Sequence, residues 1–211
     1  MTKKDAIAIA GTLSEPSKMP AYSYGLPAAE CITGAKLAAV KGSVCEGCYA
    51  LKGFYSVYKK TILPAQYKRL ESIQNPQWIE AMITLISGSK KAAFFRWHDS
   101  GDLQSVEHLE KIAIIADRLP AVKFWLPTRE YAIVNAFLKT RACPENLVIR
   151  LSAHMVGQSV KFASGMPTSS VFTDSVPAGA RECPARFQGN ACGDYRACWD
   201  PNVTEVSYHK H

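Results

Sequence analysis

The placement of the cysteines constrains this chain more than any other feature of its sequence. Six of the seven cysteines fall into two groups, one toward each end of the chain. They are Cys31, Cys45 and Cys48, spaced C-x13-C-x2-C, and Cys183, Cys192 and Cys198, spaced C-x8-C-x5-C. A C-x2-C pair on a turn directs two thiolates at one metal, and soft thiolate ligands select zinc or an iron–sulfur cluster. The sequence therefore predicts a metal centre.

The spacing favours an iron–sulfur cluster over zinc. Structural zinc usually takes its four ligands as two close pairs, whereas this chain has one close pair, Cys45 and Cys48. Three thiolates from one group suit a cluster in which one iron differs from the others. Zinc is the alternative metal, and we expect the isolated Cys143 to be an unligated thiol.

Composition indicates a globular protein in a reducing compartment. With 211 residues, 47% of them hydrophobic, the chain can bury one large core. No apolar stretch reaches the length of about 18 residues that a membrane span needs. The short apolar stretch of residues 6–10 follows Asp5 and is too brief for a signal-peptide core. We therefore expect a cytoplasmic protein, in which cysteines serve metal binding or catalysis more often than disulfides.

The net charge of +7 does not identify a partner by itself. Lys and Arg are scattered and form no run of five or more, so a nucleic-acid patch is not demonstrated by the sequence. A small-molecule substrate or an electron donor is the expected partner, and nucleic acid is kept as an alternative. The sequence leaves the oligomeric state open.

The middle of the chain alternates between strand-like and helix-like patterns. Apolar runs typical of buried strands occupy residues 92–97, 122–126, 147–151 and 171–173. Apolar residues recur at helical spacing in residues 56–73, 78–86, 105–118 and 131–138. This alternation predicts an α/β fold with parallel strands.

The segments on either side of this core differ from it in composition. Residues 11–47 are rich in Gly, Pro and Ser, with prolines that break any long helix. We therefore expect one domain with three parts: an irregular cysteine-bearing arm (1–55), an α/β core (56–175) and a cysteine-rich tail (176–211) that packs back on the core.

Polar residues follow three of the predicted strands, where parallel α/β folds place their ligands. The candidate catalytic residues at these positions are His98, Asp102, Arg129 and His154. Either histidine could act as a base or a metal ligand, although a histidine at a strand end is more often a hydrogen-bonded cap. Asp102 could orient a cationic ligand, whereas for Asp99 a turn and helix cap is favoured.

Three more side chains have a functional and a structural interpretation. Arg129 and Arg150 could clamp a carboxylate or phosphate, or pair with an acid such as Glu130. Tyr49 directly follows the close cysteine pair and could shield a metal from solvent. Trp97 and Trp125 are expected to be core residues of strands.

Several segments, in the same order along nearly the whole chain, resemble the bacteriophage family called gene product 88. They are Pro27–Cys31, Gly42–Gly53, His98–Asp102, Cys183–Ala185 and Cys192–Trp199. The resemblance implies phage origin and action in the host cytoplasm. The family pattern has a cysteine where this chain has Tyr195, which implies that this chain has lost one ligand.

That family in turn looks like a compact relative of the radical S-adenosylmethionine enzymes. The resemblance implies a partial (β/α) barrel with a [4Fe–4S] cluster on Cys31, Cys45 and Cys48, although those enzymes typically carry C-x3-C-x2-C. It also implies S-adenosylmethionine as a cofactor, with the loop Ser100-Gly101-Asp102 meeting its amine. The expected function is a redox or radical-type enzyme acting on a small substrate. The alternatives are a non-enzymatic metalloprotein, whose basic surface binds nucleic acid or a host protein, and an electron carrier.

Overall fold

The computed structural model describes residues 1–52, 55, 57–161 and 165–210. Its α-helices are α1 (Lys3–Ala10), α2 (Ile32–Ala38), α4 (Lys59–Ser72), α5 (Trp78–Ser87), α6 (Val106–Arg118) and α7 (Tyr131–Leu138). Short 3-10 helices are η1 (Ala28–Glu30), η2 (Tyr49–Leu51), η3 (Pro184–Phe187) and η4 (Ala197–Trp199). The strands are β1 (Tyr22–Tyr24), β2 (Phe94–Trp97), β3 (Lys123–Thr128), β4 (Leu147–Ser152), β5 (Thr168–Phe172), β6 (Arg181–Glu182) and β7 (Glu205–His209).

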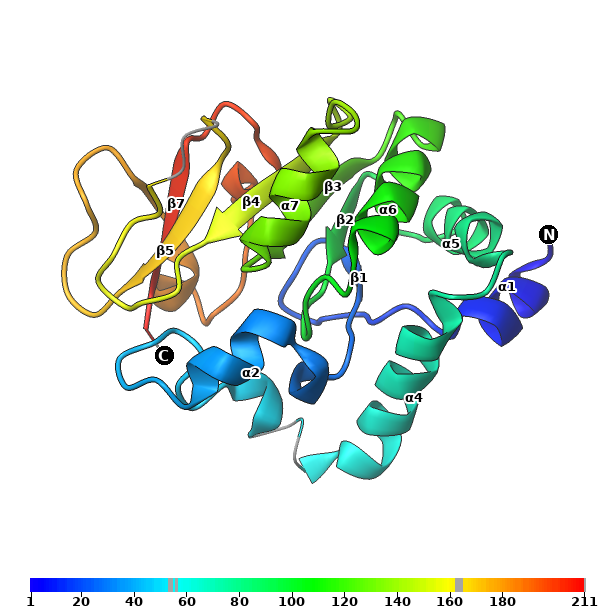
Figure 1. Cartoon of the computed structure of the whole chain (residues 1–211), viewed down its shortest axis with the longest axis horizontal. Helices are drawn as coiled ribbons and strands as arrows, with labels where there is room; N and C mark the ends of the chain where they lie inside the picture. Colours follow the sequence, from blue (N-terminus) through cyan, green and yellow to red (C-terminus); the bar gives the residue numbers. More distant parts are fainter. Residues whose placement is uncertain (53–54, 56, 162–164, 211) are drawn as a thin grey trace.

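The strands form one parallel sheet of seven strands in the order β1-β2-β3-β4-β5-β7-β6. The α/β class and the parallel pairing are therefore confirmed. The sheet does not close, because β1 and β6 are its two edges. Figure 1 shows the resulting open, twisted sheet, with the two chain termini on opposite sides of the molecule.

The regular elements of the middle segment lie close to their predicted positions. Helix α7 has the expected bounds, and α6 begins one residue late because Ser105 is its N-cap, where its side chain accepts a hydrogen bond from the His108 N–H. Helix α4 covers residues 59–72 of the predicted 56–73, and residue 56 lies outside the described residues.

The prediction of an irregular arm over residues 1–55 was wrong in part. The arm contains α1, α2 and the edge strand β1, which pairs with β2 through Tyr22 and Phe95. Strand β1 is a three-residue Tyr-Ser-Tyr segment, too short and polar to give an alternating apolar pattern. Strands β6 and β7 were likewise missed in the tail.

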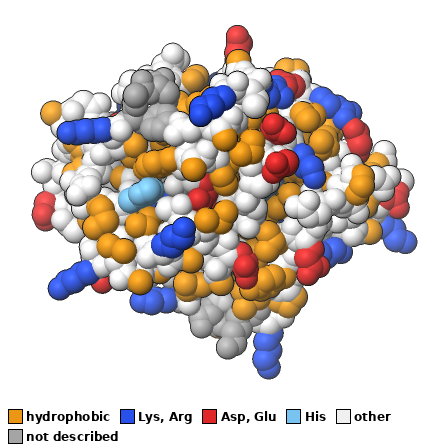
Figure 2. Space-filling model, in the orientation of Figure 1, with side chains coloured by type: hydrophobic (Ala, Val, Ile, Leu, Met, Phe, Trp, Pro, Cys, Tyr) orange, Lys and Arg blue, Asp and Glu red, His pale blue; other side chains and the backbone are white. Residues whose placement is uncertain are grey.

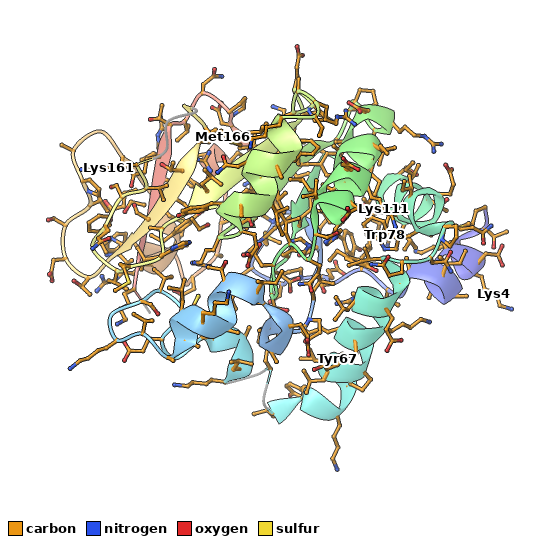
Figure 3. All side chains as sticks on the ribbon, in the orientation of Figure 1. Lys4, Tyr67, Trp78, Lys111, Lys161 and Met166 are labelled. Carbon is orange, nitrogen blue, oxygen red and sulfur yellow. The ribbon has the colours of Figure 1, made fainter. Side chains whose placement is uncertain are left out.

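One face of the sheet carries the helices and the larger core. Figure 1 shows α5, α6 and α7 over this face. Helix α5 buries Trp78, Ala81, Met82, Leu85 and Ile86, whose spacing forms one helical stripe. In Figure 3, Trp78 lies between α5 and α6. Its ring packs 5.9 Å from those of Tyr24 and Trp97, which anchors α5 to β1 and β2.

The tail covers the opposite face of the sheet. Strand residues alternate between faces, so Phe95 faces the helices while Phe94 and Trp125 face a second core with Trp199. The connection from β6 to β7 supplies this cover, and the Trp199 Nε1–H donates to the Phe95 carbonyl at 2.9 Å. Because β7 lies between β5 and β6, this connection runs backward across the sheet, and a right-handed crossover in that direction passes over the face opposite α6 and α7.

Candidate metal centre

The arm lies across the carboxyl ends of the first strands, next to the loop that follows β2. The Leu26 N–H donates to the Ser100 carbonyl at 2.8 Å, and the Ser100 hydroxyl donates back to the Leu26 carbonyl at 2.7 Å. Gly101 has a φ of 75°, and a Cβ there would lie 2.6 Å from the Leu26 Cβ. The predicted cofactor residues Ser100 and Gly101 thus form a close backbone contact that only glycine allows.

Asp99 adds a second set of contacts between this loop and the arm. Its carboxylate accepts hydrogen bonds from the Ser23 hydroxyl at 2.7 Å and from the Tyr55 hydroxyl at 3.2 Å. Tyr49 reaches the same loop, because its hydroxyl donates to the Asp99 carbonyl, while its side chain is 57% exposed. The cysteine-bearing arm is therefore positioned by the loop after β2.

The first three cysteines share one neighbourhood at these strand ends. A Cβ built on Gly34 would lie 3.6 Å from the Cys31 sulfur and 3.7 Å from the Cys45 sulfur, so Gly34 leaves room between them. Burial raises the pKa of Cys31 to about 12, and the charges of Asp102 and of the Cys48 and Cys45 thiols add to the rise. Without a bound cation the Cys31 thiol is therefore protonated at neutral pH.

Glu130 fixes the helix that starts next to Cys31. Its carboxylate accepts hydrogen bonds from the Thr33 N–H and from the Thr33 hydroxyl, both at 2.7 Å. Glu130 is the second residue after β3 and is 4% exposed. It satisfies an otherwise unpaired N–H of the first turn of α2 and holds the arm on the sheet. The sequence offered Glu130 only as an ion-pair partner for Arg129, and this tethering role was missed.

Asp102 joins the loop after β2 to the end of β3. It accepts hydrogen bonds from the Leu103 N–H at 2.8 Å, the Thr128 hydroxyl at 2.6 Å and the Arg129 N–H at 2.9 Å. Burial raises the pKa of Asp102 to about 6, although these hydrogen bonds oppose the rise. The carboxyl group therefore exchanges its proton near neutral pH while it is held in one orientation.

Arg129 and His154 complete the polar rim of this end. The Arg129 Nε–H donates to the Ala153 carbonyl at 3.3 Å, and the guanidinium charge opposes the burial that raises the pKa of Cys45. His154 Nε2 lies 3.2 Å from the Arg129 carbonyl, and its ring stacks on Tyr131 at 4.5 Å. Both predicted residues therefore lie close to the arm, and the Val44 N–H donates to the His154 carbonyl at 2.9 Å.

His98 lies in a different environment. It is 3% exposed, and neither ring nitrogen has a hydrogen-bond partner among the described residues. Its ring packs 5.3 Å from His108 and 6.3 Å from Trp97, so it belongs to the aromatic core. Burial, followed by the charges of His108 and Arg96, lowers the pKa of His98 well below its usual value.

The second cysteine group lies in the tail, on the face of the sheet opposite α6 and α7. Cys183, Cys192 and Cys198 all pack against the small core around Trp125 and Trp199. The Cys198 sulfur lies 3.2 Å from the Tyr208 hydroxyl. Arg150, a predicted ligand clamp, is fully buried and donates to the carbonyls of Thr168, Val203, Ala197 and Asp200. It therefore anchors the tail to the sheet.

Neither cysteine group is arranged as a preformed site for a single metal ion in the described residues. In the described part of the chain, no three His, Cys, Asp or Glu side chains are arranged to hold one metal ion. Two thiolates on one zinc would approach to about 3.8 Å, given Zn–S bonds of about 2.3 Å. A cluster spreads its cysteines over separate irons, so it needs thiols that share a neighbourhood without mutual contact. Cys31 and Cys45 share such a neighbourhood, since a Cβ on Gly34 would lie 3.6 Å and 3.7 Å from their sulfurs.

Other surfaces offer less chemistry. Cys143 is remote from both groups in its contacts, since its thiol donates to the Leu147 carbonyl at 3.2 Å. A cavity of about 430 Å³ lies at the amino ends of β2 and β3, away from the arm, and its walls include Ala92, Leu119 and Val122. On the face shown in Figure 2, Lys and Arg are interspersed with Asp and Glu and form no continuous basic patch. In the described residues, no helix has the length and apolarity to span a membrane.

Comparison with known proteins adds one finding. The family model described as gene product 88 matches residues 1–201 of the chain. Comparisons with curated proteins and with solved structures gave no match. The similarity to radical S-adenosylmethionine enzymes therefore stays a prediction.

Proposed function

The chain belongs to the gene product 88 family, and we propose that it is a phage-encoded iron–sulfur protein with a [4Fe–4S] cluster on Cys31, Cys45 and Cys48. The observation that carries the proposal is that the Cys31 and Cys45 sulfurs both lie next to Gly34, at the carboxyl ends of parallel strands. Such ends are where α/β folds place their reactive groups.

The residues around the three thiols suit redox or radical-type chemistry on a small substrate. When bound, a cluster supplies one-electron transfer. Arg129 contributes a positive charge that favours the thiolate of Cys45. Asp102, with a pKa of about 6, can hold or release a proton without moving, because three donors fix its carboxyl group. The host cytoplasm, which is reducing, is the proposed site of action.

The first test is the metal content of protein purified without oxygen. We expect iron and sulfide in equal amounts and a brown protein. Replacing Cys45 and Cys48 together with Ser should remove the iron bound by this group, because the close pair supplies two ligands that no neighbour can replace. Cys143→Ser is the matched control and should keep all the iron. A colourless protein with stoichiometric zinc would refute the proposal.

The second test concerns S-adenosylmethionine, the proposed cofactor of a radical-type reaction. Three cysteines leave one iron free for it, so adding it to the reduced protein should change the electron paramagnetic resonance signal. Asp102→Ala should weaken this change while the iron stays bound. Since that variant also leaves the Leu103 and Arg129 N–H groups unpaired, its melting temperature must be measured alongside. An unchanged signal in loaded wild-type protein would exclude the radical-type reaction.

A purely structural metal centre is the second candidate. It is favoured by the hydrogen bonds of Ser100 and Asp99, which hold the arm in place and so use groups that a cofactor would need. In that case metal removal should unfold the arm, and the reduced protein should not respond to S-adenosylmethionine.

A further inference from the structure

We propose that Cys183, Cys192 and Cys198 hold a second iron–sulfur cluster, separate from the first, on the face of the sheet opposite α6 and α7. The proposal extends the iron–sulfur function proposed above. The two cysteine trios lie in different parts of the fold. The first trio lies beside Gly34 at the strand ends, whereas the second lies in the connection from β6 to β7. Cys198 is 5% exposed and packs with Trp199 and Val206, while Cys183 and Cys192 are partly buried.

The members of the tail trio share one small core. Cys198 lies within it, and Cys183 and Cys192 pack against it. The backbone holds this arrangement from both sides, because the Cys183 N–H donates to the Ser207 carbonyl at 2.8 Å and the Cys192 N–H donates to the Lys18 carbonyl at 2.9 Å. Both segments are thus fixed independently of any metal.

Unpaired donors face the same side of the sheet as these thiols. Arg96 Nε, Trp125 Nε1 and Arg150 Nε are buried and have no hydrogen-bond partner among the described residues. Arg96 is the direct register partner of Trp125, and its guanidinium stacks on that ring at 4.5 Å. Arg150 uses its other nitrogens to donate to the Ala197 and Asp200 carbonyls on either side of Cys198.

These donors need acceptors that neutral thiols do not provide. A buried N–H without a hydrogen-bond partner destabilises the folded state. A thiol sulfur is only a weak acceptor. A cluster bound by thiolates carries negative charge, and its sulfurs accept hydrogen bonds that also set its reduction potential. Two arginine Nε–H groups and an indole N–H in the same core as three cysteines therefore match a negatively charged cluster.

The test is metal analysis of full-length protein purified and reconstituted without oxygen. Two [4Fe–4S] clusters would give about eight irons per chain. The double variants Cys45→Ser with Cys48→Ser, and Cys183→Ser with Cys192→Ser, should each keep about half of the iron and give different Mössbauer spectra. Cys143→Ser should keep it all.

The outcomes separate this inference from the proposed function. Wild-type protein without iron refutes both. If the Cys183 and Cys192 variant keeps all the wild-type iron, or if the tail trio binds zinc, the second cluster is refuted while the first stands. If either double variant loses all the iron, the two trios share one centre and the inference fails.

A milder substitution tests the donors without removing a ligand. Trp125→Phe deletes the indole N–H and should lower the reduction potential of the cluster that survives in the Cys45 and Cys48 variant. Trp97→Phe is the matched control, because Trp97 Nε1 is also buried and unpartnered in the described structure but belongs to the helix-covered face. It should leave the potential unchanged. Equal potentials in the Trp125 variant and its parent would show that the cluster does not lie beside Trp125.

Discussion

Two histidines lie side by side in the core between the sheet and the helices. His98 and His108 are 3% and 1% exposed, and their rings are 5.3 Å apart. His98 also has a left-handed backbone with a φ of 58°, which histidine adopts more readily than most residues. Burial lowers the pKa of His108 to about 3. Both rings are therefore neutral parts of the core at physiological pH.

This burial predicts a loss of stability in mild acid. Between the unfolded pKa of about 6.5 and the folded value of about 3, only the unfolded chain protonates His108, so stability falls as the pH drops. From pH 7 to pH 5, His108 alone should cost about 2 kcal/mol. His108→Phe removes this cost, so urea unfolding should show wild type losing that amount relative to the variant. An identical pH dependence in both proteins would contradict the neutral burial.

At the scale of elements, helix α2 is held by one carboxylate from the sheet. Glu130 accepts both the N–H and the hydroxyl of Thr33, while α2 itself buries no residue completely. A seven-residue helix is not stable by itself in water, so its position depends on tertiary contacts. The spacing between Cys31 and Cys45 therefore depends on Glu130.

We accordingly predict that Glu130→Ala loosens the arm. Hydrogen bonds to a carboxylate contribute about 1.5–3 kcal/mol each, so the variant should lose about 2 kcal/mol or more. Amide hydrogen exchange and limited proteolysis should both accelerate in residues 31–48. Glu130→Gln is the control, because its amide oxygen still accepts the Thr33 N–H and its NH₂ can donate to the hydroxyl. Exchange in the Ala variant as slow as in wild type would show that other contacts position α2.

At the scale of the whole molecule, the tail is part of the sheet and of its second core. Strand β7 lies between β5 and β6, and Arg150 of β4 donates to four carbonyls of β5 and the tail. A buried guanidinium deprived of these acceptors would be strongly destabilising. The tail therefore cannot separate from the core without cost.

Deleting the residues after Ala180 should consequently destabilise the entire protein. The truncated chain loses the cover of Trp125 and three of the acceptors of Arg150, so we expect no cooperative thermal transition. Phe187→Ser, at a side chain that is 71% exposed in the same tail, should leave the melting temperature nearly unchanged. A truncated chain that melts like wild type would show the tail to be an independent appendage.

The sequence by itself determined the class of fold and the helices and strands of the middle segment. These elements carry long, regular apolar patterns, as in α5 and α6, and such patterns record burial directly. It also determined that the cysteines form two groups, because their spacing is a property of the chain. Arg96, inside an otherwise apolar strand, is a visible sequence signal of a polar group in the second core.

The tertiary structure alone decided where those groups lie. Whether β1 forms, where β7 inserts and which face the tail covers depend on contacts between distant residues, such as the Trp199 Nε1–H with the Phe95 carbonyl. Likewise His98 follows β2 as predicted, but the left-handed backbone and the aromatic partners at that point turn its ring into the core. Local patterns carry no information about such pairings, because their energy comes from residues far apart in the chain.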